Sequence, residues 1–172
     1  MDNLFTTPIF TRYIKKNIRS KNFICVSPDA GGIERTRGLA KKINADLAII
    51  DKRRPQAGKS QVMNIIGEVK NKDCIIVDDI IDSGGTIVNA VEALKKKGAL
   101  DVYVFITHAV LSGDAINKIK KSKIKKLVIT DSIDNAQRIK NISKIQVLSI
   151  APLMAEAIKR ISNSTSVSDL FN

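Results

Sequence analysis

The stretch CIIVDDIIDSGGTIVNA, residues 74–90, contains the pattern that decides the fold of this chain. Its first four residues are apolar, as in a strand that is buried on both faces of a parallel sheet. Asp78 and Asp79 follow where this strand is expected to end, and a small polar turn comes next. After the turn, apolar residues recur at helical spacing between Ile87 and Gly98. The predicted order is therefore strand, glycine-containing turn, helix.

The turn has the residue types of a phosphate-binding loop. It consists of Asp82, Ser83, Gly84, Gly85 and Thr86. Glycines let backbone N–H groups approach an anion closely, and the start of a helix adds the positive end of its dipole. The two hydroxyl groups can donate further hydrogen bonds to phosphate oxygens. A purely structural turn could use the same residues, but their order after paired aspartates favours a ligand site.

The paired aspartates suggest which ligand this is. Asp78 and Asp79 are expected at the carboxyl edge of the sheet, where open α/β folds bind their ligands. Carboxylates there can accept hydrogen bonds from a vicinal diol, or hold a magnesium ion directly or through water. A sugar phosphate fits this arrangement better than a nucleoside triphosphate alone. Residues 74–90 resemble the phosphoribosyl pyrophosphate signature of the type I phosphoribosyltransferase fold.

Length and charge limit the possible classes of protein. A chain of 172 residues can bury one sizeable core and is too short for two ordinary domains, so we expect one domain over residues 1–172. The 29 Lys and Arg residues exceed the 17 Asp and Glu residues, which gives a net charge of +12. The lysines form short clusters typical of solvated helix faces, without interleaved aromatic residues. Nucleic-acid binding is therefore not favoured.

The remaining composition indicates a reduced compartment and no membrane association. Cys25 and Cys74 lie inside apolar runs, so they are predicted to be reduced and buried. His108, the single histidine, is more typical of a structural residue and receives no role. The first residues contain no apolar signal segment, and no stretch approaches about 20 apolar residues. We therefore expect a cytoplasmic protein.

Alternating patterns predict an α/β fold, with a mostly parallel sheet flanked by helices on both faces. Strands are expected at residues 23–26, 47–50, 62–69, 74–77, 102–106, 127–129 and 145–148. Helices are expected at about residues 8–19, around residues 39–43, between residues 87 and 98, and at residues 115–119 and 152–161. The polar segment 56–60 has no pattern and is predicted to be a mobile loop.

A second glycine-containing turn follows the first predicted strand. It has the sequence SPDAGG and includes Asp29, Ala30, Gly31 and Gly32. The aspartate could hold magnesium while backbone N–H groups bind a diphosphate. A structural turn with an aspartate helix cap is the alternative. Together with the turn after Asp79, this segment favours a functional site.

A cationic segment, DKRRP, follows the second predicted strand. It places Lys52, Arg53 and Arg54 at another strand end, directly before the predicted mobile loop. Transfer of phosphoryl groups requires cations against the charge that develops on the moving phosphate. A solvated charge cluster is the usual explanation for such a run, but the position among the expected ligand loops favours a functional role.

These motifs, taken in order, resemble a known enzyme family. The relevant segments are SPDAGGIERTRGLAKKI, LAIIDKRRP, VMNIIGEV, CIIVDDIIDSGGT, THAVLSG, VITDSI and ISNSTSVSDLF. From Asp2 onward the chain looks like the carboxyl-terminal half of the ribose-phosphate pyrophosphokinase family. DKRRP and VMNIIG are the most specific of these segments. Ser83 stands where threonine is commoner in the family, and Ala109 replaces the usual proline after Thr-His.

The resemblance implies a transferase that moves the diphosphoryl group of ATP to ribose 5-phosphate, giving phosphoribosyl pyrophosphate and AMP. It implies Mg²⁺ as the cofactor, assembly as a homo-oligomer and a part in nucleotide biosynthesis. This chain would be the half that binds ribose 5-phosphate. The amino-terminal half of the family, which supplies much of the ATP site and a histidine ligand of magnesium, would lie outside it.

The resemblance also implies a role for each site residue. Residues 82–86 would bind the 5-phosphate of ribose 5-phosphate, and Asp78 and Asp79 its ring hydroxyls or their magnesium. Asp29 would be a magnesium ligand in the diphosphate loop formed by residues 29–32. Lys52 and Arg54 would be the catalytic cations, with Arg54 also contacting substrate.

Two other functions remain open at this stage. One is a nucleobase phosphoribosyltransferase of the same fold, whose length this chain fits better, although the DKRRP and VMNIIG segments argue against it. The other is a catalytically incomplete binding or regulatory subunit, against which the intact Lys52, Arg54 and residues 82–86 count. An enzyme assay would distinguish the three functions. Formation of AMP indicates the diphosphokinase, release of diphosphate when a base is added indicates the phosphoribosyltransferase, and neither product indicates the binding or regulatory subunit.

Overall fold

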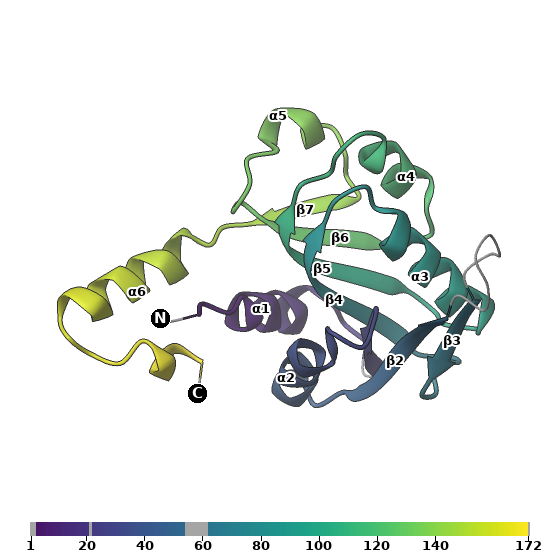
Figure 1. Cartoon of the computed structure of the whole chain (residues 1–172), viewed down its shortest axis with the longest axis horizontal. Coiled ribbons are helices and arrows are strands. Elements are labelled where there is room, and N and C mark those ends of the chain that lie inside the picture. Colours follow the sequence, from purple (N-terminus) through teal and green to yellow (C-terminus); the bar gives the residue numbers. More distant parts are fainter. Residues whose placement is uncertain (1–2, 21, 54–61, 172) are drawn as a thin grey trace.

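A seven-stranded sheet forms the centre of the computed structural model, which describes residues 3–20, 22–53 and 62–171 (Figure 1). The strand order is β3-β2-β1-β4-β5-β6-β7, and only the β2–β3 pair is antiparallel. The strands are β1 (Phe23–Ser27), β2 (Asp46–Arg53), β3 (Val62–Ile66), β4 (Asp73–Ile81), β5 (Val102–Ala109), β6 (Lys126–Thr130) and β7 (Ile145–Leu148). The predicted α/β architecture with a mostly parallel sheet is confirmed.

Helices cover both faces of this sheet. They are α1 (Thr7–Asn17), α2 (Ile33–Ile43), α3 (Gly85–Lys96), α4 (Ala115–Lys121), α5 (Ala136–Ile139) and α6 (Ala151–Ser162), followed by the 3₁₀ turn η1 (Ser168–Leu170). Side chains of α1 and α2 pack on one face of the sheet, and side chains of α3 and α4 pack on the other. The parallel strands are thus sandwiched between two helical layers.

The apolar run in β4 is explained by these two layers. Cys74 and Ile76 belong to the core on the α3 side, whereas Ile75 and Val77 belong to the core on the α1 side. Alternate residues of a strand face opposite sides, so both sets must be apolar when both faces are covered. Cys25 and Cys74 are buried and free, and burial raises the pKa of both thiols to about 12.

Several strand boundaries differ from the prediction. β2, predicted at residues 47–50, runs from Asp46 to Arg53 because its pairing with β3 continues to Arg53↔Val62, so Lys52 and Arg53 lie inside the strand rather than after it. β4 continues to Ile81, since its pairing with β5 persists to Ile81↔Ala109, and Asp78 and Asp79 therefore lie inside the strand. For the same reason β5 extends beyond residue 106 to Ala109. β3 ends at Ile66 rather than at residue 69, because the next residue is a glycine with φ of +114°.

The second half of the chain ends in a helix that lies apart from the sheet (Figure 1). Within α6 only Ala157 is buried. Phe5 and Phe171 contact each other edge to face, with ring centroids 5.3 Å apart. The short elements α5 and η1 were not predicted, because a few residues cannot show a helical period. Among the described residues, no helix has the length and apolarity needed to cross a bilayer.

Lys144 caps the carboxyl end of α4 and provides a first testable prediction. Its ammonium group donates hydrogen bonds to the carbonyl oxygens of Ile119, Lys120 and Ser122, at 3.1, 2.7 and 2.8 Å. Carbonyls at a helix end lack the partners of the helix interior, and here that of Ile119 also accepts from the N–H and hydroxyl of Ser122. We expect Lys144→Ala to lower the free energy of unfolding by about 1–2 kcal/mol in urea denaturation. The exposed control Lys120→Ala should change it by less than about 0.5 kcal/mol, and equal values would contradict the capping role.

Candidate active site

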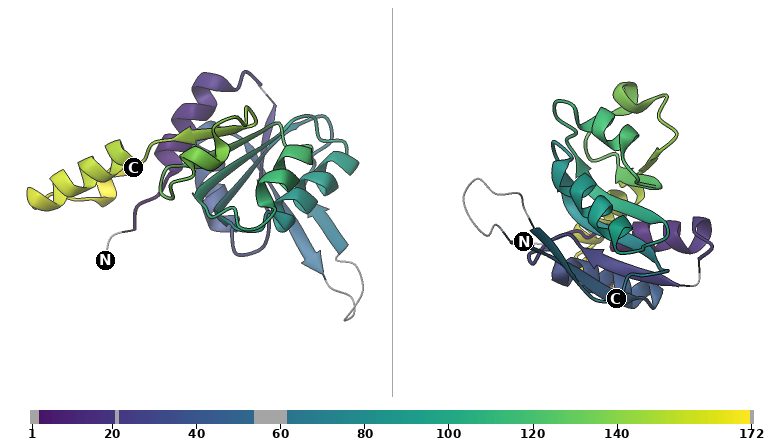
Figure 2. Two further views of the ribbon diagram at one scale, coloured as in Figure 1. Left: turned by 90° about the horizontal axis from the view of Figure 1, so that it is seen from above. Right: turned by 90° about the vertical axis from the view of Figure 1, so that its right-hand side faces the viewer.

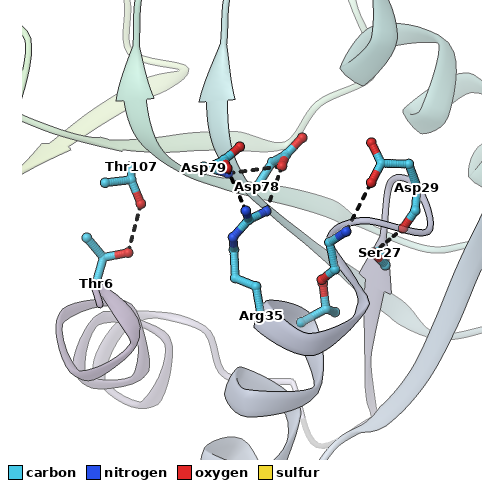
Figure 3. Close-up of polar contacts among 9 residues, drawn as sticks. Thr6, Ser27, Asp29, Arg35, Asp78, Asp79 and Thr107 are labelled. Carbon is cyan, nitrogen blue, oxygen red and sulfur yellow. Dashed lines mark hydrogen bonds and ion pairs between the residues drawn. The ribbon is translucent and has the colours of Figure 1, made fainter. Parts of the chain in front are cut away.

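The candidate site lies at the edge of the sheet where the parallel strands β1, β4 and β5 end. β1 and β4 are neighbours in the sheet, so the loop after β1 and the end of β4 are adjacent. Figure 3 shows Asp29, from the loop after β1, on the same side as Asp78 and Asp79 of β4. Ligands of open α/β sheets bind at this edge. The structure therefore brings together the two segments that the sequence suggested for sugar and diphosphate binding.

One arginine connects the two aspartates of β4. Arg35 Nη1 lies 2.8 Å from Asp78 Oδ1, and Arg35 Nη2 lies 2.6 Å from Asp79 Oδ2 (Figure 3). The backbone N–H of Asp79 also donates to Asp78 Oδ1, at 3.0 Å. Arg35 is on α2 and is not among the site residues predicted from the sequence. Its only signal was its position three residues after Gly32, on the first turn of the helix that follows the glycine turn.

The two carboxylates differ in their surroundings. The side chain of Asp78 is 16% exposed, whereas that of Asp79 is 56% exposed. Burial is the main cause that raises the pKa of Asp78 to about 6. The hydrogen bond from the backbone of Asp79 and the charge of Arg35 lower this pKa, and the charges of Asp79 and Asp29 raise it. At neutral pH Asp78 is thus mainly ionised and can accept hydrogen bonds.

The first loop is held by its own hydrogen bonds. Ser27 is buried, and its hydroxyl donates to the backbone oxygen of Asp29 at 2.6 Å. The N–H of Gly32 donates to Asp29 Oδ1 at 3.0 Å. A Cβ at Gly32 would lie 2.9 Å from the Ser27 hydroxyl oxygen, so a larger residue does not fit. The turn is thus structurally stable and also presents the Asp29 carboxylate beside the β4 aspartates (Figure 3).

The second loop leads from β4 into α3. Gly84 has φ of +75°, which favours glycine, and it precedes the first residue of α3. Among the described residues, no side chain caps the amino end of this helix, so its first N–H groups can bind an anion. Lys118 donates to the backbone oxygen of Ser83 at 3.3 Å, which adds positive charge near the loop. A Cβ at Gly85 would meet nothing within 4 Å, so there is open space beside the loop.

The donor set fits magnesium that arrives with a phosphate-bearing substrate. Among the described residues, no group of three or more His, Cys, Asp or Glu side chains could hold a metal ion. Mg²⁺ rarely needs such a cage, because it keeps several waters and binds through one or two carboxylates plus substrate phosphates. Asp29, adjacent to a glycine turn suited to a diphosphate, provides a carboxylate of this kind.

The cationic segment is only partly described. The backbone of Lys52 is in β2 and pairs with Met63 of β3. Figure 2 shows β2 and β3 extending together beyond the rest of the sheet. The structure describes nothing of the Lys52 side chain, and Arg54 and the predicted loop at residues 56–60 lie outside the described residues. Their roles remain predictions.

Two further polar contacts near the site were not predicted from the sequence. The hydroxyl oxygens of Thr6 and Thr107 are 2.9 Å apart, which ties the segment before α1 to the end of β5 (Figure 3). His108 Nδ1 lies 3.0 Å from the Ser132 hydroxyl oxygen. This contact is consistent with the structural role that a single histidine suggested.

Comparison with known proteins assigns the family. The model of the "Phosphoribosyl synthetase-associated domain" matches residues 52–172. The ribose-phosphate pyrophosphokinase of Rhizobium meliloti (strain 1021) is 52% identical over 171 residues, which covers 99% of this chain and 55% of that protein. The Brucella melitensis protein of the same name is 53% identical, with the same coverage. The chain thus spans about half the length of these curated relatives.

Solved structures agree with this assignment. Phosphoribosylpyrophosphate synthetase from Mycobacterium smegmatis superimposes with a TM-score of 0.85 at 33% identity, over 95% of this chain and 52% of that one. Purine phosphoribosyltransferase from Pyrococcus horikoshii shares the fold, with a TM-score of 0.54 at 18% identity over 84% of each chain. The chain has the type I phosphoribosyltransferase fold and belongs to the family of the phosphoribosyl synthetase-associated domain.

Proposed function

We propose that this chain is the ribose 5-phosphate-binding half of a ribose-phosphate diphosphokinase. The proposed reaction transfers the β,γ-diphosphoryl group of ATP to the anomeric hydroxyl of ribose 5-phosphate, giving phosphoribosyl pyrophosphate and AMP. The observation that carries the proposal is the pair Asp78 and Asp79 at the sheet edge, next to two glycine turns. The relatives named ribose-phosphate pyrophosphokinase, identical at about half of the aligned positions, support it.

Each part of the site has a task in this reaction. Asp78 and Asp79 accept hydrogen bonds from the ring hydroxyls of the sugar, and residues 82–86 bind its 5-phosphate at the start of α3. Residues 30–32 offer backbone N–H groups to the diphosphate, and Asp29 offers a carboxylate to Mg²⁺. Magnesium, when bound, would reduce the charge repulsion between phosphate oxygens and the attacking hydroxyl. Lys52 and Arg54 stabilise charge on the group in transfer.

We also propose that the chain assembles as a homo-oligomer and acts in the cytoplasm. Met154, Ile158 and Ile161 are 42%, 62% and 62% exposed and recur at helical spacing along α6. This apolar face is suited to a second copy of the chain, because homodimer interfaces are more apolar than other protein surfaces. Light scattering of the purified chain tests the oligomeric state, and a chain that is monomeric at all concentrations would contradict the proposed assembly.

Calorimetric titration of the chain with ribose 5-phosphate, in the presence of magnesium, tests the main proposal. We expect the sugar phosphate to bind without ATP, because its proposed contacts all come from this chain. A second titration with Mg-ATP, followed by assay for AMP, asks whether the chain is sufficient for the reaction. Absence of sugar phosphate binding would contradict the proposal, and binding of a nucleobase with release of diphosphate would favour a phosphoribosyltransferase.

Gly85→Ala should separate ligand binding from folding. The added methyl group has room in the free protein, but in the proposed complex the phosphate lies beside this backbone. We expect the Kd for ribose 5-phosphate to rise by about tenfold or more, because the methyl group would push the phosphate away from the backbone N–H groups, and weakening one charge-assisted hydrogen bond has about this effect. The melting temperature should not fall. Gly38→Ala is the matched control, because its Cβ also meets nothing within 4 Å and it lies in α2.

Gly38→Ala should leave the Kd unchanged and stabilise α2 slightly, since alanine favours helices more than glycine does. Equal Kd values for the two variants would show that the phosphate does not lie beside Gly85.

A further inference from the structure

The contact between Arg35 and the aspartate pair engages one oxygen of each carboxylate. The guanidinium binds Asp78 Oδ1 and Asp79 Oδ2, at 2.8 and 2.6 Å, through its two terminal nitrogens. Asp78 Oδ1 also accepts the backbone N–H of Asp79. The other two oxygens, Asp78 Oδ2 and Asp79 Oδ1, take part in none of these contacts. Each carboxylate thus keeps one acceptor oxygen for a ligand.

The convergence of these two side chains needs an explanation. Asp78 and Asp79 are consecutive in β4, and consecutive strand residues ordinarily face opposite sides. Two carboxylates also repel each other at short distance. In the structure both nonetheless reach one guanidinium (Figure 3). The planar guanidinium of arginine has fixed donor directions, so it can offset this repulsion and fix the angle between the two carboxylates. The ammonium group of a lysine cannot do so.

Arg35 also connects the pair to the diphosphate loop. It is on the first turn of α2, three residues after Gly32, and a Cβ at Gly32 would lie 3.6 Å from Arg35 Nη1. The side chain of Arg35 is only 30% exposed. The guanidinium therefore lies between the glycine turn and the aspartate pair.

The net charge of the cluster decides which ligand it prefers. Two ionised aspartates carry two negative charges, and Arg35 reduces the total to one. Divalent cations favour sites with more anionic oxygen atoms, and the guanidinium would repel a cation bound between the carboxylates. Neutral hydroxyl groups meet no such repulsion, and they donate to the two remaining oxygens. The cluster therefore favours a diol over a metal ion.

We propose that Arg35 is a positioning residue that holds Asp78 and Asp79 for the sugar diol and keeps divalent cations off this pair. The inference rests on the proposed function, and it assigns the pair to sugar hydroxyls rather than to magnesium. Magnesium then belongs to the Asp29 side of the site, where the diphosphate lies.

Calorimetry on the full chain tests the inference with three variants. Arg35→Gln should raise the Kd for ribose 5-phosphate by about tenfold or more, because the two carboxylates lose their fixed geometry. Arg35→Lys should have an intermediate effect, since an ammonium is a point charge without the fork. Arg37→Gln removes the same charge from an exposed position on the same helix and should leave the Kd unchanged.

A second readout separates positioning from a merely structural role. Mn²⁺ titrated without sugar, and followed by electron paramagnetic resonance, should bind Arg35→Gln at least about fivefold more tightly than the wild type or Arg37→Gln. A variant that was merely unfolded would not gain affinity for Mn²⁺. Thermal melting of each variant checks that it is folded, and Arg35→Lys keeps the test available if Arg35→Gln is unstable.

The outcomes distinguish the inference from the proposed function. A wild-type chain that binds no ribose 5-phosphate overturns the proposed function and removes the role of Arg35 with it. A wild type that binds the sugar, together with Arg35→Gln and Arg37→Gln of equal Kd, overturns the positioning role alone. Unchanged Mn²⁺ affinity in both Arg35 variants overturns the exclusion of cations.

Discussion

Lys52→Ala is expected to lower turnover by about 10²–10³-fold, the usual effect of removing one group that stabilises charge in a transition state. The Kd for ribose 5-phosphate should remain nearly unchanged. Lys52 lies at the end of β2, beyond the residues of β2 that pair with β1 and within the part that pairs only with β3. The groups that we propose for sugar binding come instead from β4 and the start of α3. We therefore expect Lys52 to act on the group in transfer rather than on the sugar.

This measurement requires a protein that joins the chain to the remaining part of the longer pyrophosphokinases. Steady-state kinetics should then show a reduced kcat with little change in the KM for ribose 5-phosphate, as expected for an interaction made mainly in the transition state. Lys42→Ala, an exposed lysine on α2, is the control and should retain full turnover. Unchanged kcat would remove Lys52 from the mechanism, and a proportionate loss of sugar affinity would make it a binding residue.

The central features of the fold could be predicted because each has a local cause. Burial on both faces requires a continuous apolar run, and residues 74–77 show one. Alternation of strands and helices implies a parallel sheet, and a parallel sheet gathers its carboxyl ends at one edge. The positions of Asp29, Asp78 and the turn after Ile81 at this edge follow from those two steps, without any knowledge of side-chain contacts.

The features that were missed depend on contacts between distant segments. Arg35 and Asp78 are separated by 43 positions in the sequence, and nothing near Arg35 shows that it faces β4. The extension of β4 to Ile81 is a property of its pairing with β5 and not of its own residues. Lys144 stands in a polar segment that shows no capping signal, yet it caps α4 from 22 to 25 positions away. In each case the feature depends on a contact with a distant segment, which the local sequence does not encode.

Gly67→Ala should be the most destabilising of the single substitutions considered, with a loss of about 2–5 kcal/mol in the free energy of unfolding. Two effects combine. Gly67 has φ of +114°, a conformation that L side chains rarely adopt. In addition, an added Cβ would lie 2.8 Å from the Cβ of Ala48, 3.0 Å from its Cα and 3.3 Å from the backbone oxygen of Leu47. These are backbone or Cβ atoms of β2, which cannot move aside as the end of a flexible side chain could.

Gly113→Ala is the matched control for backbone strain. It also has a positive φ, of +52°, but its Cβ would meet nothing within 4 Å. Urea denaturation followed by circular dichroism should therefore give a loss of about 1–2 kcal/mol, from conformation alone. The difference between the two variants measures the clash with β2. If the losses are equal, β3 can shift away from β2 at little cost, and the hairpin that carries Lys52 is then less rigidly fixed to the sheet than the packing of Gly67 on Ala48 indicates.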